Sequence, residues 1–213
     1  MNFINDKIIK YVKSHSCSES ELLSELRRET ELKCLKPIML SGEYQGRLLS
    51  MISKIKSPEN ILEIGTYTGY STLCLAEGLN KNGQIHTIDK NEELVDFQKK
   101  YFSRSKFKNN IIQHTGEALK IIPKLNFGFD FIFLDADKEN YSKYLKIITP
   151  ILNKNGLLIS DNVLWHGKVL ENKKKQDLTT KKIDKFNKEL ISNMNYQTIM
   201  LSVRDGLSLS IKL

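Results

Sequence analysis

The sequence has few cysteines and no long apolar run, and both absences limit what the protein can be. Its three cysteines, Cys17, Cys34 and Cys74, are scattered and form no C-x-x-C pair. That pattern argues against a disulfide framework and a zinc knuckle, and it favours a reducing cytoplasm. No apolar run approaches the roughly 20 residues that a membrane-spanning helix needs, so we expect no membrane partner. The N-terminal stretch alternates apolar and charged residues and therefore lacks the apolar core of a signal peptide.

Arginine is also scarce, because 28 of the 33 basic residues are lysine and only five are arginine. The net charge of +8 suggests a nucleic-acid partner, but specific phosphate and base recognition relies on the planar guanidinium group. A genome-wide compositional bias would also produce a lysine-rich chain. The segment from Lys168 to Lys188 carries eight lysines against three acids. This Lys168–Lys188 segment is either a solvated helix face and loop or an electrostatic funnel for an anionic substrate.

A chain of 213 residues is long enough for one domain with a substantial core and too short for two comfortable ones. We predict a single domain over residues 1–213, with a helical N-terminal extension at 1–57 and an α/β core at 58–213. Within the extension, Ser18 followed by Glu21 is typical of a helix start, so Ser18 is the predicted N-cap. A second helix is expected from Gly42 to Lys54, where apolar residues recur at helical spacing before Pro58.

From residue 58 onward, short apolar runs alternate with longer amphipathic stretches. The apolar runs predict buried strands at Ile61–Ile64, Ile85–Ile88, Ile111–Gln113, Phe129–Leu134 and Leu157–Ser160. The amphipathic stretches predict helices at Ser71–Leu79, Glu92–Ser103, Glu117–Ile122 and Ser142–Leu152. The chain is expected to end with a helix at Thr179–Ser192 and two strands at Tyr196–Ser202 and Leu207–Ile211.

This alternation implies right-handed crossovers and a parallel sheet that is covered on both faces. The residues Arg204-Asp205-Gly206 between the last two strands predict a tight turn, so this pair would be antiparallel. The predicted fold class is therefore α/β: a doubly wound, mostly parallel, seven-stranded sheet with a terminal antiparallel hairpin and N-terminal helices.

The segment ILEIGTYTGYS, residues 61–71, lies where the first predicted strand of the core ends and a helix begins. Gly65 and Gly69 allow the backbone to turn sharply and to approach a ligand closely. Such a turn directs backbone N–H groups at an anion, with Ser71 as a further donor. The spacing is E-x-G-x-x-x-G and not the G-x-G-x-x-G of a dinucleotide site, so nothing here makes room for a pyrophosphate.

Polar positions also follow the next two predicted strands. Asp89 lies 24 residues after Gly65, where a carboxylate can accept hydrogen bonds from both hydroxyls of a ribose. The third strand leads to Gly116, Glu117 and Ala118, at the edge where an adenine would be flanked. One glycine motif alone is equally well explained as an ordinary strand–helix turn. The ordered set favours a site for an adenosyl amino acid.

Acids follow the fourth and fifth predicted strands as well. Asp135 comes directly after the fourth, and Asp161 and Asn162 come directly after the fifth. The first, fourth and fifth strands of a doubly wound sheet would lie side by side, so these residues would converge beside the cofactor turn. Their oxygens are hard ligands that suit Mg²⁺, with Mn²⁺ or Ca²⁺ as alternatives. Taken singly, each acid is better explained as a helix cap; together with Asn162 and Lys138 they favour an open metal site.

These motifs together resemble those of the cation-dependent class I O-methyltransferases, the caffeoyl-CoA and catechol O-methyltransferase family, especially its bacterial members. The resemblance covers nearly the whole chain and implies a Rossmann-like methyltransferase fold, with S-adenosyl-L-methionine as cofactor and Mg²⁺ (or Mn²⁺/Ca²⁺) as cation. The matching motifs are Met39-Leu40-Ser41-Gly42 through Gln45-Gly46, EIGTYTGYST, Asp89, Gly116-Glu117-Ala118, LDADKENY, SDNVLWHGKV and Arg204-Asp205-Gly206.

The resemblance assigns a role to each candidate residue. Asp135, Asp161 and Asn162 would hold the cation, and Lys138 would be the catalytic base. The cofactor pocket would be lined by Met39, Glu63, Gly65, Tyr67, Gly69, Ser71, Asp89, Gly116, Glu117, Ala118 and Asp135.

Two aromatic residues near the metal motifs, Trp165 and Tyr141, are candidate substrate contacts. Trp165 is the only tryptophan, and an aromatic wall for a planar substrate and a core anchor under its loop are equally good interpretations. The implied reaction transfers a methyl group in line to one of two neighbouring oxygens of an aromatic acceptor, while Lys138 accepts the hydroxyl proton or stabilises the oxyanion. Orientation and electrostatics would supply most of the acceleration.

Two acceptors fit this reaction. One is a small aromatic with vicinal hydroxyls, catechol-like or caffeoyl-CoA-like; the alternative is 5-hydroxyuridine in tRNA, which some bacterial relatives methylate. The Lys168–Lys188 segment would serve coenzyme A phosphates or an RNA backbone equally well. A non-catalytic adenosyl-binding or RNA-binding module would need idle metal residues, and a nicotinamide oxidoreductase would need the missing glycine spacing. The family also implies a homodimer formed through the N-terminal helices and the terminal strands.

Overall fold

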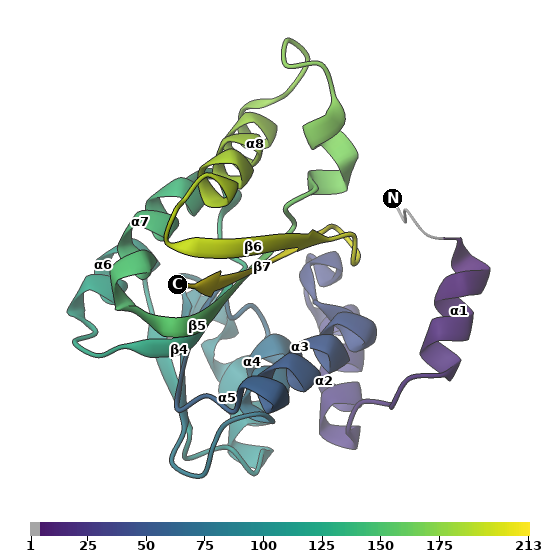
Figure 1. Ribbon diagram of the computed structural model, residues 1–213. Helices are drawn as coiled ribbons and strands as arrows, with labels where there is room; N and C mark the ends of the chain where they lie inside the picture. The colour runs from purple at the N-terminus through teal and green to yellow at the C-terminus, as the bar shows by residue number, and fades with distance from the viewer. Residues whose placement is uncertain (1–4) are drawn as a thin grey trace. The chain divides into compact units, whose positions relative to one another are not determined.

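Figure 1 shows the computed structural model of the chain, in which residues 5–213 are described. Two compact units make up this described part, residues 5–117 and residues 118–213. The prediction of a single domain, with an extension at 1–57 and a core at 58–213, stays a prediction. No helix between residues 5 and 213 has the length and apolar character needed to cross a membrane.

Helices open the first unit. These are α1 (Asp6–Ser14), α2 (Glu21–Lys33), the short 3-10 helix η1 (Pro37–Met39) and α3 (Gly42–Lys56). The prediction that Ser18 caps a helix is wrong. The cap of α2 is Ser20, whose hydroxyl accepts the N–H of Leu23 at 3.4 Å. Leu23 and Leu26 are buried, so core packing sets where the first turn begins, and only Ser20 then lies within reach of a free N–H.

Strands and helices then alternate through the rest of the first unit. They are β1 (Asn60–Ile64), α4 (Tyr70–Ala76), β2 (Gln84–Asp89), the 3-10 helix η2 (Glu92–Leu94), α5 (Val95–Arg104) and β3 (Ile111–Thr115). The strands are parallel and lie in the order β3-β2-β1. Ile61, Leu62 and Ile85 are fully buried, as expected of parallel strands covered on both faces.

The second unit continues the alternation and ends in a hairpin. It contains α6 (Ala118–Ile121), η3 (Ile122–Lys124), β4 (Phe129–Leu134), η4 (Lys138–Asn140), α7 (Tyr141–Ile151), β5 (Leu152–Asp161), η5 (Trp165–Leu170), α8 (Leu178–Ile191), β6 (Tyr196–Leu201) and β7 (Leu207–Lys212). Its strand order is β4-β5-β7-β6, with β4 and β5 parallel and β7 antiparallel to both of its neighbours. The predicted α/β class, with a mostly parallel seven-stranded sheet and a terminal antiparallel hairpin, is confirmed.

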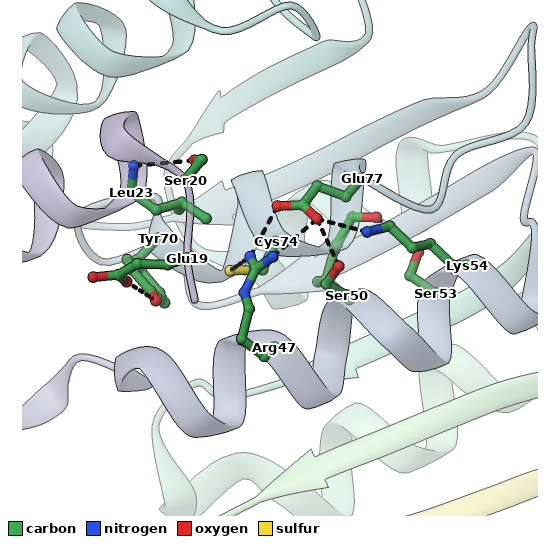
Figure 2. A network of polar contacts seen from close by, with 11 residues as sticks. Glu19, Ser20, Leu23, Arg47, Ser50, Ser53, Lys54, Tyr70, Cys74 and Glu77 are labelled. Carbon is green, nitrogen blue, oxygen red and sulfur yellow. Dashed lines mark hydrogen bonds and ion pairs between the residues drawn. The ribbon is translucent and has the colours of Figure 1, made fainter. Parts of the chain in front are cut away.

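A polar network joins α3 to α4, the helix that follows the turn with Gly65 and Gly69, called here the glycine turn (Figure 2). Arg47 donates hydrogen bonds of 3.0 and 2.8 Å to the two carboxylate oxygens of Glu77 and a third, of 3.4 Å, to Cys74 Sγ. Ser50 and Lys54 donate to the same carboxylate at 2.7 and 2.9 Å. Glu77 caps the C-terminus of α4, so the network fixes one end of this helix against α3.

Close approach of the two helices depends on Gly46. A Cβ atom at this position would lie 2.6 Å from the ring of Tyr70 and 2.9 Å from Cys74 Sγ. The Tyr70 hydroxyl donates to Glu19, which also pairs with Arg27 at 2.8 Å. Because Tyr70 is the first residue of α4, these contacts hold the start of the helix, directly after the glycine turn.

Removal of the Glu77 charge is expected to lower stability and to flatten its dependence on pH. Burial alone would raise the pKa of Glu77, but hydrogen bonds from Arg47, Lys54 and Ser50 outweigh burial and lower it to about 2. The stabilisation is fully present above the unfolded-state pKa and is lost as the pH falls through the folded-state value. We expect Glu77→Gln to cost on the order of 2 kcal/mol at neutral pH.

Urea unfolding of both proteins at several pH values below neutral tests this prediction. The wild type should lose stability relative to Glu77→Gln as the pH falls from about 5 towards 2. The exposed Glu93 offers a matched control, because Glu93→Gln should leave the wild-type pH dependence unchanged. Parallel stability curves for wild type and Glu77→Gln would contradict the prediction.

Candidate active site

Left-handed backbone conformations shape the turn that follows β1. Gly65, Tyr67 and Gly69 have φ angles of 106°, 48° and 88°. A side chain at Gly69 is excluded, because a Cβ atom there would lie 2.5 Å from the ring of Phe102. Tyr67 is the unusual member of the three, since few residues other than glycine adopt this conformation. Such backbone persists only where the surroundings hold it.

Asp89, at the end of β2, accepts a hydrogen bond that helps to keep Tyr67 in this conformation. Its Oδ2 accepts the N–H of Tyr67 at 2.7 Å, and its Oδ1 accepts the N–H of Asn91 at 2.9 Å. Its backbone carbonyl accepts the N–H of Gly116 at 2.8 Å. One residue therefore links the turns after β1, β2 and β3. A carboxylate has about four lone-pair sites, so two backbone contacts leave Asp89 with acceptor capacity for the predicted ribose hydroxyls.

Gln98 is a supporting residue of this turn that sequence reasoning missed. It is buried on α5, where its amide donates to the carbonyl of Tyr67 and accepts a hydrogen bond from Gln113. The only signal in the sequence is a glutamine on the apolar side of an amphipathic helix. That signal does not say which backbone group the side chain reaches.

Glu63, predicted to line the cofactor pocket, lies inside the core of the first unit. Its fully buried carboxylate accepts hydrogen bonds from the hydroxyls of Thr72 and, at 2.6 Å, Thr87. Because the Thr87 proton goes to Glu63, the Thr66 hydroxyl donates to Thr87 at 2.5 Å. A buried charge needs such partners. Glu63 thus joins β1, β2 and α4 behind the turn, and its contact with the cofactor stays a prediction.

The other cofactor candidates are distributed over both units. The Tyr67 hydroxyl donates to the carbonyl of Lys36 at 3.0 Å, which brings η1 and its exposed residue Met39 next to the glycine turn. Ser71 is buried in the first turn of α4. Gly116, with φ 139°, and Glu117 follow β3 in the same unit. The remaining two, Ala118 and Asp135, belong to the second unit.

The second unit places the two predicted metal-binding acids at the ends of neighbouring strands. Leu134 pairs with Ser160 in the parallel register of β4 and β5, and Asp135 and Asp161 are the next residues. The buried hydroxyl of Tyr141 lies 3.1 Å from the carbonyl oxygen of Leu134 and 3.0 Å from that of Asp161. A single side chain from α7 therefore links the two strand ends that carry the acids.

Lys138 is held against the first of these acids. Its Nζ donates to Asp135 Oδ1 and to the Tyr141 hydroxyl, each at 2.7 Å. The side chains of Lys138 and Asp135 are 11% and 19% exposed, so water screens this pair only in part. Burial, followed by the charges of Asp135 and Asp161, raises the pKa of Tyr141 well above its usual value. The Tyr141 hydroxyl therefore stays protonated and can donate a hydrogen bond to the carbonyls at the strand ends.

Asn162 follows Asp161 in a left-handed conformation, with φ 57°. Its N–H donates to Asp161 Oδ1 at 2.6 Å, and the Asp161 side chain is almost fully buried. No group of three or more His, Cys, Asp or Glu side chains in residues 5–213 is arranged to hold a metal ion; the predicted set has two acids and an amide. Two carboxylates at adjacent strand ends, with an amide on the next residue, are nonetheless hard oxygen donors that fit a magnesium-type cation.

The two candidate substrate contacts differ in exposure. Tyr141 is fully buried, and its hydroxyl is occupied by Lys138 and the strand ends. Trp165 is half-buried at the start of η5, with φ 47°. Its indole Nε1 is buried and has no hydrogen-bond partner within residues 5–213, although a buried indole N–H usually finds one. Substrate contact by either residue stays a prediction.

Comparisons with known proteins agree with one another. A sequence profile described as O-methyltransferase matches residues 13–213. Caffeoyl-CoA O-methyltransferase 5 of Nicotiana tabacum is 32% identical over 221 residues, which cover 96% of this chain and 90% of that protein. Caffeoyl-CoA O-methyltransferase 1 of Arabidopsis thaliana is 31% identical over 96% of this chain and 84% of that protein.

Solved structures extend the likeness to the whole fold. An O-methyltransferase from Bacillus cereus, crystallised in complex with SAH, has a TM-score of 0.89 at 27% identity, with 97% of each chain covered. An O-methyltransferase from Streptomyces achromogenes, involved in tomaymycin synthesis and in complex with SAM, has a TM-score of 0.87 at 25% identity. That likeness covers 97% of this chain and 96% of the other.

Proposed function

Because this chain belongs to the O-methyltransferase family and is an S-adenosylmethionine-dependent enzyme, we propose that it methylates one of two vicinal oxygens of an aromatic acceptor with the help of a divalent cation. The observation that carries this proposal lies in the second unit. Asp135 and Asp161 follow paired residues of β4 and β5, Asn162 comes next, and Lys138 is held 2.7 Å from Asp135.

The first unit carries most of the proposed cofactor site. The turn from Gly65 to Ser71 has little side-chain bulk at its glycines, and Asp89 keeps acceptor capacity beside it. These features suit the methionine and ribose parts of S-adenosylmethionine. The cofactor supplies an electrophilic methyl group on a sulfonium sulfur.

The proposed cation site consists of Asp135, Asp161 and Asn162, with Mg²⁺ as the preferred ion and Mn²⁺ or Ca²⁺ as alternatives. These three protein donors would leave room at the ion for acceptor oxygens and water. A cation held there would supply Lewis-acid chemistry, which would lower the pKa of the acceptor hydroxyl.

Lys138 is the proposed base. In its neutral form, its Nζ accepts the proton of the acceptor hydroxyl, and in its charged form it stabilises the resulting oxyanion. Asp135 and Tyr141 fix this nitrogen from two sides, so little reorganisation is needed during the reaction. The C–O bond forms as the C–S bond breaks, without a covalent enzyme intermediate.

A small aromatic diol, catechol-like or caffeoyl-CoA-like, is the preferred acceptor. Proteins that are similar over most of the chain include caffeoyl-CoA O-methyltransferases of plants. Trp165 supports an aromatic substrate, because one face of its indole ring would stack on a planar substrate ring. Its indole N–H has no hydrogen-bond partner among the described residues and would still need a hydrogen-bond acceptor.

The alternative acceptor is 5-hydroxyuridine in tRNA, and the Lys168–Lys188 segment suits its backbone as well as it suits the phosphates of coenzyme A. Four of its lysines form ion pairs with Asp177, Glu139, Glu189 and Asp184. Lys173, Lys174 and Lys175 are exposed between η5 and α8, and none of the three has an ion-pair partner in the described chain. An unneutralised cluster of this kind suits a phosphate backbone.

Transfer of labelled methyl from S-adenosylmethionine distinguishes these acceptors. Caffeoyl-CoA, catechol and hypomodified tRNA are offered in turn, with Mg²⁺ and then with chelator. We expect labelling of a diol that is lost in chelator. Labelling of tRNA instead, weakened by the triple variant Lys173→Glu, Lys174→Glu, Lys175→Glu, would establish the alternative. Undiminished transfer in chelator would refute the cation.

Two further proposals concern the state of the protein in the cell. A homodimer is supported by exposed apolar side chains on the helices of the first unit, such as Met51 and Ile55, and on the terminal strands, such as Ile199 and Ile211. A cytoplasmic location is supported by the cysteines, since Cys17, Cys34 and Cys74 are all free thiols.

A further inference from the structure

The loop from Asn162 to Gly167, called here the 162–167 loop, has an unusual backbone. Asn162, Trp165 and His166 have φ angles of 57°, 47° and 55°, and Gly167 has 78°. Three residues with side chains thus adopt the left-handed region within five positions, where such residues are uncommon. A run of this kind persists only if neighbouring structure holds it in place.

The main hold comes from Asp205 and Gly206, in the turn before β7. The loop N–H groups of Val163 and Leu164 donate to the carbonyls of Gly206 and Asp205 at 3.2 and 2.9 Å. The N–H of His166 donates to the Asp205 carboxylate at Oδ1. Both the backbone and the side chain of Asp205 therefore receive hydrogen bonds from the loop.

The fit between this turn and the loop is close. Gly206 has φ 88°, and a Cβ atom at this position would lie 2.5 Å from the side chain of Leu164. Asn187 on α8 adds one further contact, because its amide donates to the carbonyl of Val163 at 2.8 Å. That contact uses a carbonyl of the loop, whereas the N–H groups of Val163, Leu164 and His166 bond to the turn before β7.

The Asp205 side chain is poorly explained as ordinary surface charge. It is 12% exposed, and its Oδ2 is buried without a hydrogen-bond partner among the described residues. Burial of a carboxylate is unfavourable unless the group is hydrogen-bonded or paired. Its carboxylate accepts one backbone hydrogen bond, from the N–H of His166 at the centre of the left-handed run.

We propose that Asp205 is the positioning residue of the 162–167 loop, and that it holds the backbone so that Asn162 faces the cation and Trp165 faces the acceptor. The roles of Asn162 and Trp165 rest on the function proposed above. The effect of Asp205 on the conformation of the loop does not depend on that function, and it can be measured without cation or acceptor.

Trp165 reports on this loop directly, because it is the only tryptophan of the chain. In Asp205→Ala, the His166 N–H loses its acceptor and the left-handed run relaxes. We expect tryptophan emission to shift to longer wavelength and to be quenched more strongly by acrylamide. The half-saturating Mg²⁺ concentration should rise about 10–100-fold, as is typical when an outer-shell partner is lost. Affinity for S-adenosylhomocysteine should be unchanged.

Asp205→Asn separates a positioning role from a requirement for charge. It retains a carbonyl oxygen for the His166 N–H, so quenching and Mg²⁺ dependence should return close to wild type. Asp184→Ala is the matched control, because Asp184 lies on α8 of the same unit and pairs only with Lys188 in the described contacts. Asp205→Ser replaces Asp205→Ala should the alanine variant fail to fold, as judged by circular dichroism.

The outcomes separate this inference from the function on which it partly rests. Wild-type quenching in a folded Asp205→Ala or Asp205→Ser variant would overturn it, as would an Asp205→Asn variant as impaired as alanine. A wild-type enzyme that is indifferent to chelator would refute the cation proposal. In that case the quenching comparison still decides the role of Asp205.

Discussion

Replacement of Lys138 by alanine is expected to lower turnover by about 10²–10⁴-fold, the usual contribution of a positioned acid or base. The reason is that Lys138 is the only lysine whose Nζ is fixed against Asp135 among the described contacts. Binding of S-adenosylhomocysteine should not change, because Lys138 is not among the residues proposed to line the cofactor pocket. The measurements are kcat at saturating cofactor and acceptor, and cofactor affinity by calorimetry.

The Mg²⁺ dependence of the same variant sharpens the test. Loss of a cationic group 2.7 Å from Asp135 removes electrostatic competition for that carboxylate, so the half-saturating Mg²⁺ concentration should stay equal or fall. A rise would mean that Lys138 supports the cation site instead of acting on the acceptor. Lys182→Ala is the control, since Lys182 pairs with the neighbouring Glu139. Near-normal turnover in Lys138→Ala would remove its assignment as base.

Asp161→Ala should abolish cation-dependent activity, with a loss greater than the 10–100-fold typical of an outer-shell partner. Its carboxylate is a proposed direct ligand, and it also accepts the N–H of Asn162. The substitution therefore removes one proposed ligand, Asp161, and loosens a second, Asn162. Residual activity should no longer respond to Mg²⁺ or to chelator. Activity across a Mg²⁺ titration and binding of Mn²⁺ by electron paramagnetic resonance are the two measurements.

Asp184→Ala again serves as the matched control for loss of one carboxylate in the second unit, and it should keep the wild-type Mg²⁺ response. Asp161→Asn retains an oxygen donor and should recover part of the Mn²⁺ binding. An Asp161→Ala variant with a normal Mg²⁺ titration would show that the cation, if used, binds elsewhere. Loss of activity with normal Mn²⁺ binding would point instead to a structural role for Asp161.

The strands could be predicted because their signal is local. A strand such as Phe129–Leu134 is apolar throughout, since a parallel strand covered on both faces buries every side chain. The ends of elements depend on pairing between distant residues. β5 begins at Leu152, earlier than expected, because Leu152 pairs with Phe129 before the register shifts. That pairing joins residues far apart in the chain. The first residues of β5 form no apolar run from which a strand could be predicted.

The residues of the candidate site also fall into two groups, those with a local signal in the sequence and those placed only by the folded chain. The sequence alone determined which residue types occur where each strand ends: the glycines after β1, Asp89 at the end of β2, Asp135 after β4 and Asp161 at the end of β5. These are properties of short segments, where the need for a sharp turn or a hard oxygen donor restricts the choice of residue.

Only the tertiary structure decided which side chains hold those residues in place. Gln98 donates to the carbonyl of Tyr67, and the Tyr141 hydroxyl contacts the ends of two strands. Asp205 accepts the N–H of His166, in a loop about forty residues earlier in the chain. Each contact joins a side chain to a backbone group on another element, and no periodicity or spacing encodes such a pairing. Backbone groups are alike in every residue, so their partners are set by where the folded chain places them.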